Sequence, residues 1–441
     1  TFKLTKELKI ALFASFFTAI SPSEIFFSRK SFENGAGIFF LLVSMSCLCT
    51  YLEKQKQQRW LYLTAVLSAL GMYTYFSHAV MIPLMITTFI LIFRKRFTQR
   101  FKEYLPALSL WILLIIPLII IITTNPESRY RSQTVFITQD STLGRELKYT
   151  ESENSLLSLF LHFKTIGDFS FNRYLSQFDP VYLFSNGLDL TNQGPINSGP
   201  LLLFQLPLLL IAVFYLIQRV DFTNSAKLLV FLIALGALPS GLTFEAHSPH
   251  RMIIVFTILN IITGIGAYFL SIRIKRLRTA FKVTSIFILI TILIINIVSF
   301  LHIYFVNYPY EKSQYMQYPF KQVAQFAWSQ YGNFDLIVFD PLFGKDVPFV
   351  GTGAYYYLAY FGNYPPSKFQ EQYRIGKKER EDIFDKFSIR KIDWGQDRNL
   401  KNTLIIGSPW SLPISSIDKS RIIKTFYFYD NVVAFYAIRP E

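Results

Sequence analysis

Apolar runs separated by short polar segments dominate the chain as far as residue 301. A helix needs roughly 20 apolar residues to cross a hydrocarbon core about 30 Å thick. We therefore expect membrane-spanning helices wherever such a run occurs. The runs are Ile10–Ile20, Gly35–Leu52, Trp60–Phe93, Leu105–Thr124, Leu201–Ile217, Leu228–Leu242, Met252–Ile272 and Val283–Leu301.

The run Trp60–Phe93 is uncharged apart from His78 and is too long for one ordinary span. We expect two short antiparallel helices with His78 at the outer turn between them. This division places all the strongly basic segments on one face of the membrane, as the Lys and Arg excess of cytoplasmic loops requires. Those segments contain Lys3/Lys6/Lys9, Lys54/Lys56/Arg59, Arg94/Lys95/Arg96/Arg100/Lys102, Arg219/Lys227 and Arg273/Lys275/Arg276/Arg278/Lys282. The prediction is a bundle of about nine spans with a cytoplasmic start.

Two long polar stretches then fall on the outer face. In the first, 124–200, apolar residues recur at helical spacing between Leu156 and Ile166, which predicts an amphipathic helix lying in the membrane interface. The second, 304–441, has the pattern of a small α/β domain with a helix over Pro319–Tyr331. Its strands are expected at Leu336–Phe339, Ile389–Trp394, Thr403–Ile406, Ile422–Tyr427 and Val432–Ile438. The turn signal Asp430-Asn431 makes the last two a hairpin. We thus predict a transmembrane domain over 1–303 and an extracytoplasmic α/β domain over 304–441.

Composition agrees with a multi-pass membrane protein and argues against a soluble globular one. The chain has 441 residues, 51% of them hydrophobic, and a net charge of +15. Because the bases lie mostly in short loops, the charge indicates membrane orientation and not a nucleic-acid partner. Cys47 and Cys49 share one apolar run and are expected to fill the core. The chain opens at Thr1 without a signal peptide, so we expect it to begin inside a longer protein.

The candidate chemistry consists of polar clusters at the outer ends of the spans, since no soluble-enzyme motif is present. Guanidinium binds phosphate through two hydrogen bonds, and ionisable groups at membrane depth are usually functional. Candidate substrate- and phosphate-binding residues are Arg251, His250, Arg29, His78 and Tyr75. Candidates for orienting Arg251 or holding a divalent metal are Glu245, His247 and Glu33. Beyond that metal no cofactor is expected.

A structural explanation competes with each of these roles. Arg29 and Arg251 could be interfacial anchors whose guanidinium groups reach the lipid headgroups. A lone His78 is more often a satisfied interfacial histidine. Glu245, His247 and His250 in one short loop form a weak metal signal. For Arg251 the clustering favours function.

The sequence around these clusters resembles the bacterial and archaeal membrane glycosyltransferases related to dolichyl-phosphate-mannose protein mannosyltransferases, which have the GT-C fold. The similar passages are Ile20-Ser21-Pro22 through Phe26-Phe27-Ser28-Arg29 to Phe32-Glu33, Leu61–Pro83 with Gly71 and Tyr73-Thr74-Tyr75, Tyr174–Gly187, Leu206-Pro207, and His247 with Pro249-His250-Arg251. Together they run from about Ile20 to Gly266. One departure is Gly187-Leu188-Asp189, which stands where the family has a Gly-Asp pair.

The resemblance implies a glycosyltransferase of the inner (plasma) membrane and cell envelope. It would move a hexose or pentose from a polyprenyl-phosphate-linked donor to a glycan, lipid or protein acceptor at the outer face. The family's catalytic acid follows a first span that we do not find in this chain, so we expect that residue upstream of Thr1, and the catalytic residue here is unknown. The alternatives are a non-enzymatic transporter or flippase of lipid-linked sugars, and a polysaccharide polymerase or ligase. A transporter predicts buried mid-membrane charge and inverted repeats, which the sequence lacks.

Overall fold

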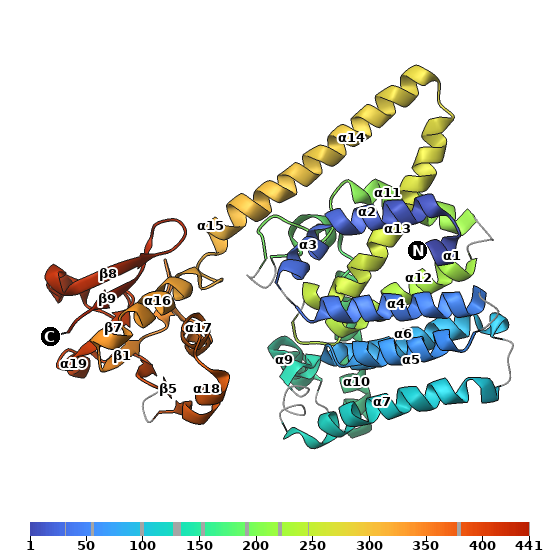
Figure 1. The fold of residues 1–441 in the computed structure, drawn as a ribbon. Coiled ribbons are helices and arrows are strands. Elements are labelled where there is room, and N and C mark those ends of the chain that lie inside the picture. Colours follow the sequence, from blue (N-terminus) through green and yellow to red (C-terminus); the bar gives the residue numbers. More distant parts are fainter. Residues whose placement is uncertain are drawn as a thin grey trace. The chain divides into compact units, whose positions relative to one another are not determined.

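The computed structural model divides the chain into two compact units, residues 1–303 and 304–441. It describes residues 1–30, 32–53, 57–97, 101–126, 134–150, 155–189, 194–218, 223–245, 247–376 and 381–440. Of the loop bases named above, Lys54, Lys56, Arg100 and Arg219 lie outside these ranges. The first unit is helical and the second contains the strands (Figure 1).

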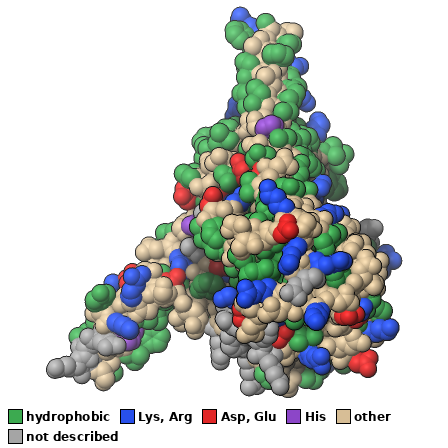
Figure 2. Space-filling view, turned by 90° about the vertical axis from the view of Figure 1, so that its left-hand side faces the viewer, with side chains coloured by type: hydrophobic (Ala, Val, Ile, Leu, Met, Phe, Trp, Pro, Cys, Tyr) green, Lys and Arg blue, Asp and Glu red, His purple; other side chains and the backbone are tan. Residues whose placement is uncertain are grey.

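Each apolar run of the first unit is helical, and the longest run forms two helices. The helices are α1 Phe2–Thr5, α2 Leu8–Ile20, α3 Pro22–Arg29, α4 Asn34–Glu53, α5 Arg59–Met72, α6 Phe76–Ile92, α7 Leu105–Thr124, α9 Ser141–Tyr149, α10 Ser155–Ser176, α11 Gln205–Gln218, α12 Thr223–Gly241, α13 Pro249–Lys275 and α14 Thr279–His302. Short 3-10 or π turns occur at η1 Arg94–Arg96, η2 Phe101–Glu103, η3 Ile137–Gln139 and η4 Tyr182–Asn186. Many apolar side chains of these helices are exposed, among them Leu113, Phe214 and Phe287. The space-filling view shows apolar side chains over much of the face that is drawn (Figure 2).

Within the described ranges, five helices are long and apolar enough to cross a membrane: α4, α7, α12, α13 and the helix that begins with α14. A sixth span results if α2 and α3, which meet at a 56° bend, are counted together. The helices α6 and α11 are apolar but shorter. The first unit is therefore a bundle of candidate membrane helices, and the number of nine spans stays a prediction.

The long run Trp60–Phe93 is two helices, α5 and α6, as predicted from its length. The chain turns at Tyr73–Tyr75, so His78 lies in the first turn of α6 and not in the connection itself. The two helices pack against each other, and α5 also packs against α4 and α7 (Figure 1). This hairpin carries Tyr75 and His78 to one end of the bundle.

The central element of the first unit is α13, a 27-residue helix that packs against α2, α11 and α12. Glycines allow two of these contacts. A Cβ at Gly264 would clash with the backbone nitrogen of Ala14 in α2, and one at Gly266 would clash with the carbonyl oxygen of Leu208 in α11. Small residues at these positions let the helix backbones approach closely. Arg251 and His250 lie in the first turn of this helix.

The long segment 124–200 contains the amphipathic helix that its spacing predicts. It is α10, and the apolar side chains Leu156, Phe160 and Phe163 are 77%, 64% and 68% exposed. Its position in a membrane interface stays a prediction. Helix α10 packs against α12, which holds the segment at the end of the bundle that the sequence predicts to be the outer one.

The second unit is a seven-stranded mixed sheet in the order β4-β5-β6-β1-β7-β9-β8. Its strands are β1 Leu336–Phe339, β4 Arg374–Ile375, β5 Asp382–Phe384, β6 Phe387–Ile389, β7 Thr403–Gly407, β8 Ile422–Tyr427 and β9 Val433–Ile438, beside a separate pair of β2 Leu342–Phe343 and β3 Phe349–Val350. The β1 strand runs parallel to both β6 and β7. Its helices are α15 Tyr308–Lys312, α16 Tyr318–Ser329, α17 Ala354–Phe361, α18 Pro366–Gln372 and α19 Trp394–Asp397. The predicted helix, the strands at β1, β7, β8 and β9, and the final hairpin are confirmed.

The strand predicted at Ile389–Trp394 is misplaced. The strand β6 ends at Ile389. Beyond it, some backbone N–H groups donate to side-chain carboxylates and not to a neighbouring strand. The Asp340 carboxylate accepts from the backbone nitrogen of Ile392, at 3.0 Å, and the Asp393 side chain caps α19. The apolar residues after Ile389 therefore belong to a loop and a helix start.

Candidate functional site

Three chain segments far apart in the sequence meet around Tyr75, at the turn between α5 and α6. The ring of His250 stacks on Phe32, with 6.1 Å between centroids and 8° between planes, and meets the Tyr75 ring edge-on at 6.4 Å. Asn34, at the start of α4, donates to the His250 carbonyl oxygen at 2.5 Å. The structure thus brings Tyr75 and His250 together, as the sequence predicts, and adds Phe32 to them.

His78 lies on the other side of Tyr75 and is a packing residue between helices. Its ring is 5.8 Å from the Tyr75 ring, and its side chain is buried. A Cβ at Gly37 of α4 would clash with His78 Nδ1, so only glycine leaves room for this ring. The Thr74 hydroxyl lies 3.1 Å from the same nitrogen. His78 therefore supports Tyr75 and is not among the residues that line the cavity described below.

Arg251 points into the bundle and is held in place by two partners. Its guanidinium donates to Thr243 Oγ1 at 2.5 Å and lies 3.3 Å from the Glu245 carboxylate. The side chain of Arg251 is only 8% exposed, whereas that of Glu245 is 35% exposed. The guanidinium is therefore largely buried between these partners, and Glu245 lies where it can orient it.

The loop before α13 is fixed by a second arginine, which the sequence did not suggest. Arg173 of α10 donates to the carbonyl oxygens of Thr243 and Phe244, at 2.9 and 2.5 Å, and to Asp140 at 2.5 Å. Burial alone would raise the pKa of Asp140, but the backbone N–H groups of Leu143 and Thr142 and the Arg173 charge together hold that pKa below its usual value. The clamp sets the position of the threonine that holds Arg251.

Arg251 is at the edge of a cavity of about 370 Å³ whose other walls are mostly apolar. We call it the Arg251 cavity. Its lining is Tyr75, Phe76, Ser77, Val80, Met81, Leu84, Val135, Phe136, Leu238, Pro239, Leu242, Thr243 and Arg251. Helices α6 and α12 supply the apolar walls, and Phe136 pairs with Thr243 in an isolated β-bridge that closes one side. A cation beside apolar walls matches a ligand that joins a phosphate to a hydrocarbon tail.

The three candidate metal ligands of the loop do not converge. Ser248 donates to the Glu245 carboxylate at 2.9 Å and lies 3.2 Å from His250 Nδ1, so a serine stands between these two side chains. His247 turns away from them: its ring packs on Tyr182, and its Nε2 lies 3.3 Å from the carbonyl oxygen of Ser176. Across the described ranges no three His, Cys, Asp or Glu side chains are close enough to hold a metal ion. The suggestion of a metal therefore rests on the sequence alone.

The environment of His247 predicts a pH dependence. Burial lowers its pKa below the ordinary value of 6.5 and the Arg173 charge adds to this, although the Ser176 carbonyl and Asp179 oppose it. The unfolded chain then binds this proton more readily than the folded one, so folding stability should fall as the pH drops from about 7 to 5. Thermal unfolding of the full chain should show this fall, and His247→Gln should reduce it. The matched variant His302→Gln, at the exposed end of α14, should leave it unchanged; an equal reduction by both variants would contradict the prediction.

Arg29 and Glu33 are exposed residues near the connection from α3 to α4. Arg29 is in the last turn of α3, three residues before the Phe32 that stacks on His250. Sequence reasoning missed Glu24 of the same helix, whose carboxylate accepts from the Thr257 hydroxyl of α13 at 2.5 Å. Its signal was available, since Glu24 is a lone acid in a passage of apolar residues and serines.

One family model matches part of the chain. Residues 1–121 match the family model of dolichyl-phosphate-mannose-protein mannosyltransferase, which confirms the resemblance found in the first two similar passages and indicates a glycosyltransferase of the mannosyltransferase type. No curated protein and no solved structure matches the chain. The later similar passages, including that of Arg251, lie beyond the matched residues.

Proposed function

We propose that this chain acts in the transfer of a sugar from a polyprenyl-phosphate donor to an acceptor at the outer face of the membrane, with the phosphate held at Arg251. The observation that carries the proposal is the Arg251 cavity, in which a buried, oriented guanidinium adjoins apolar walls from α6 and α12. A polyprenyl phosphate has the same two parts. The family match over α1 to α7 indicates the reaction class.

Arg251 has a defined task in this reaction. As an acceptor hydroxyl attacks the anomeric carbon, the bond from that carbon to the phosphate oxygen breaks and the polyprenyl phosphate leaves with the electron pair. Negative charge grows on the leaving oxygen, and a cation already oriented by Glu245 and Thr243 stabilises it without further rearrangement. The hydroxyl proton goes to a carboxylate, for which we name no residue in this chain.

The other candidate residues have supporting roles in the proposal. Tyr75 lines the cavity and presents its ring to His250, so it is placed to contact the sugar or its phosphate. His250 and Arg29 would contact the donor from the α13 and α3 sides. His78 positions Tyr75, and Glu33 stays an exposed group of the same connection as Arg29.

A donor-cleavage assay tests the proposal. Native membranes that contain the full-length protein should release polyprenyl phosphate from polyprenyl-phosphate mannose labelled in the lipid, and Tyr75→Ala should lower this release at least tenfold. The control Tyr62→Ala changes the same residue type in α5 and should leave the release unchanged, because Tyr62 is not part of the cavity lining. Equal release with and without the protein would refute the proposal.

The outer-face placement has its own test. The strongly basic loops all fall on one predicted face of the membrane, which is the cytoplasmic one by the Lys and Arg excess of cytoplasmic loops. This predicts that the second unit lies outside the cytoplasm. A reporter active only in the cytoplasm should therefore be silent when fused after Pro440 and active when inserted after Leu277, between α13 and α14. Activity of the C-terminal fusion would contradict the predicted topology and the outer-face chemistry with it.

A further inference from the structure

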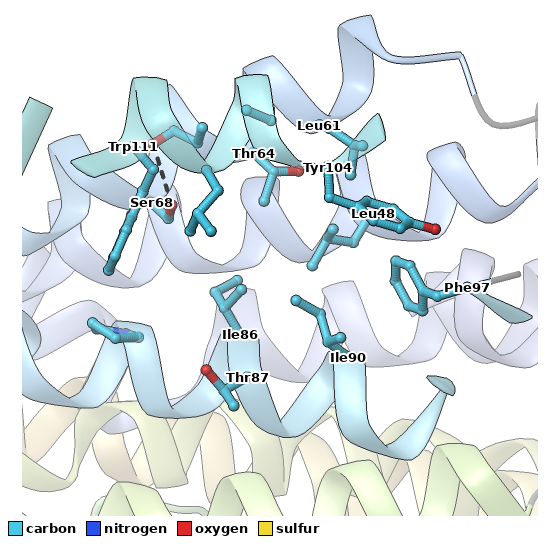
Figure 3. A pocket seen from close by; sticks show the side chains of 14 residues that line it. Leu48, Leu61, Thr64, Ser68, Ile86, Thr87, Ile90, Phe97, Tyr104 and Trp111 are labelled. Atoms are coloured by element: carbon cyan, nitrogen blue, oxygen red, sulfur yellow. Dashed lines mark hydrogen bonds between the residues drawn. The ribbon is translucent and has the colours of Figure 1, made fainter. Parts of the chain in front are cut away.

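A second cavity of about 370 Å³ lies between α5, α6 and α7, with Leu48 of α4 at its edge. We call it the α5–α7 cavity. Figure 3 shows Ile86 and Ile90 of α6 pointing toward side chains of α4 and α5, with Phe97 and Tyr104 at one end and Trp111 at the other. It exists because α7 packs mainly on α5, with only Ala107 and Ile115 buried along its length.

The walls of this cavity are hydrocarbon in character. Its hydroxyl side chains include Thr64 and Ser68, and both bond to their own helix: Thr64 Oγ1 donates to the carbonyl oxygen of Trp60 at 2.8 Å, and Ser68 Oγ to that of Ala65 at 3.3 Å. At the Trp111 end, the Tyr73 hydroxyl donates to the carbonyl oxygen of Leu114 and ties α5 to α7. An apolar chain is therefore the ligand part that these walls suit.

Cations gather at the opposite end, where Phe97 and Tyr104 lie. Each of the three helices that form the cavity contributes at that end: α5 begins at Arg59, α6 is followed directly by η1, and α7 is preceded by Lys102. The residues Arg59, Arg94, Lys95, Arg96 and Lys102 are all exposed there. Two nearby acids offset them only in part, since Glu53 is paired with Lys6 and Glu103 is a single carboxylate next to Lys102 in the sequence. The excess of positive charge matches an anionic headgroup.

We propose that the α5–α7 cavity is a binding site for an anionic phospholipid, with one acyl chain between α5, α6 and α7 and the headgroup phosphate on the cations of η1 and Lys102. The site is separate from the Arg251 cavity. On α6, Phe76, Val80 and Leu84 line the Arg251 cavity, whereas Pro83, Ile86 and Ile90 line the α5–α7 cavity. The cations of η1 follow Leu84 by about two to three helical turns. The lipid would stabilise the loosely packed α7 by filling the gap beside it.

Trp111 makes the site measurable, because a lipid brominated on its acyl chain quenches a tryptophan that it touches. The full chain is reconstituted in phosphatidylcholine bilayers that contain the same minor fraction of brominated phosphatidylglycerol or brominated phosphatidylcholine. The difference between the wild type and Trp111→Phe isolates the Trp111 signal. We expect brominated phosphatidylglycerol to quench that signal several-fold more than brominated phosphatidylcholine. Equal quenching of the Trp111 signal by the two lipids overturns the proposal.

Matched variants test the cationic half of the site. The triple change Arg94→Gln, Lys95→Gln and Lys102→Gln should abolish the preference for phosphatidylglycerol, since each cation accounts for roughly a fivefold change in affinity. The control triple Arg273→Gln, Lys275→Gln and Arg276→Gln removes the same charge at the end of α13 and should keep it. Loss in both triples would show a general charge effect and overturn the site. Full reversal of the quenching by an equimolar amount of polyprenyl phosphate would assign the cavity to the donor lipid and overturn the proposal as well.

Discussion

Replacing Arg251 by alanine should lower kcat/KM for sugar transfer by roughly 100- to 1,000-fold, because removal of one pre-oriented donor to a developing negative charge has an effect of this size. The structure supports a large loss of kcat/KM, since the guanidinium is buried and the change leaves the Glu245 carboxylate without the cation that it now pairs with. Arg251→Lys should recover only part of the loss, because lysine keeps the charge but not the two-pronged geometry. Kinetics of the full-length protein with labelled donor measure both variants.

The neighbouring threonine provides the control for Arg251. Thr243→Val removes the hydrogen bond to Arg251 at nearly constant volume and leaves the cation and its carboxylate partner in place. We expect a loss of about tenfold from this variant, since a hydrogen bond to a charged group is worth about 1.5 kcal/mol at the lower end of its range and the ion pair remains. If Arg251→Ala changes neither donor affinity nor turnover, the residue is an anchor and the proposed phosphate contact is wrong.

The largest stability effect is expected in the second unit, at Arg390. This side chain is 5% exposed and makes a two-pronged pair with the Asp397 carboxylate, at 2.7 and 2.8 Å, with Glu381 at 3.6 Å. Arg390→Ala would leave Asp397 buried without its cation, and losses of this kind cost about 3–5 kcal/mol. Denaturant unfolding of the full chain, followed through tryptophan fluorescence, should show it, because Trp394 begins the helix that contains Asp397.

Two further variants separate the buried pair from a general effect of losing an arginine. Arg374→Ala removes the same residue type from the exposed edge strand β4 and should change stability by no more than about 0.5 kcal/mol. The double change Arg390→Met and Asp397→Leu should recover part of the loss, because the buried Asp397 carboxylate is removed together with the cation that pairs with it. Similar destabilisation by Arg374→Ala and Arg390→Ala would show that burial of the pair is not the cause.

Sequence patterns predicted what depends on local spacing. The division of Trp60–Phe93 into α5 and α6 follows from the length of a bilayer-crossing helix, and the hairpin of β8 and β9 follows from alternation around Asp430-Asn431. The amphipathic helix α10 was visible in the same way. The strand placed at Ile389–Trp394 is wrong, although its apolar residues fit a strand pattern. The carboxylate of Asp340, just after β1, accepts a hydrogen bond from the backbone nitrogen of Ile392 in the loop that follows β6.

The site was predicted only as a set of residues at span ends. The stacking of Phe32 on His250 joins positions far apart in the chain, and no local pattern specifies which span ends are neighbours. The Arg173 clamp was missed for the same reason, because two of its partners are carbonyl oxygens, which leave no mark in a sequence. For His78, its polarity suggested a contact with a ligand. In the structure its ring packs against Gly37, where the absence of a side chain leaves room for it inside the bundle.

The close packing of α13 makes the position of Arg251 depend on residues far from it along the same helix. Gly264 and Arg251 are on one continuous helix, thirteen positions and so about 20 Å apart. A helix of this kind behaves as a stiff rod, and a bulky side chain wedged between α13 and α2 at Gly264 would tilt the rod and displace its far end. A bulky side chain at Gly264 should therefore shift the Arg251 guanidinium, although the two residues lie at distant points of the helix.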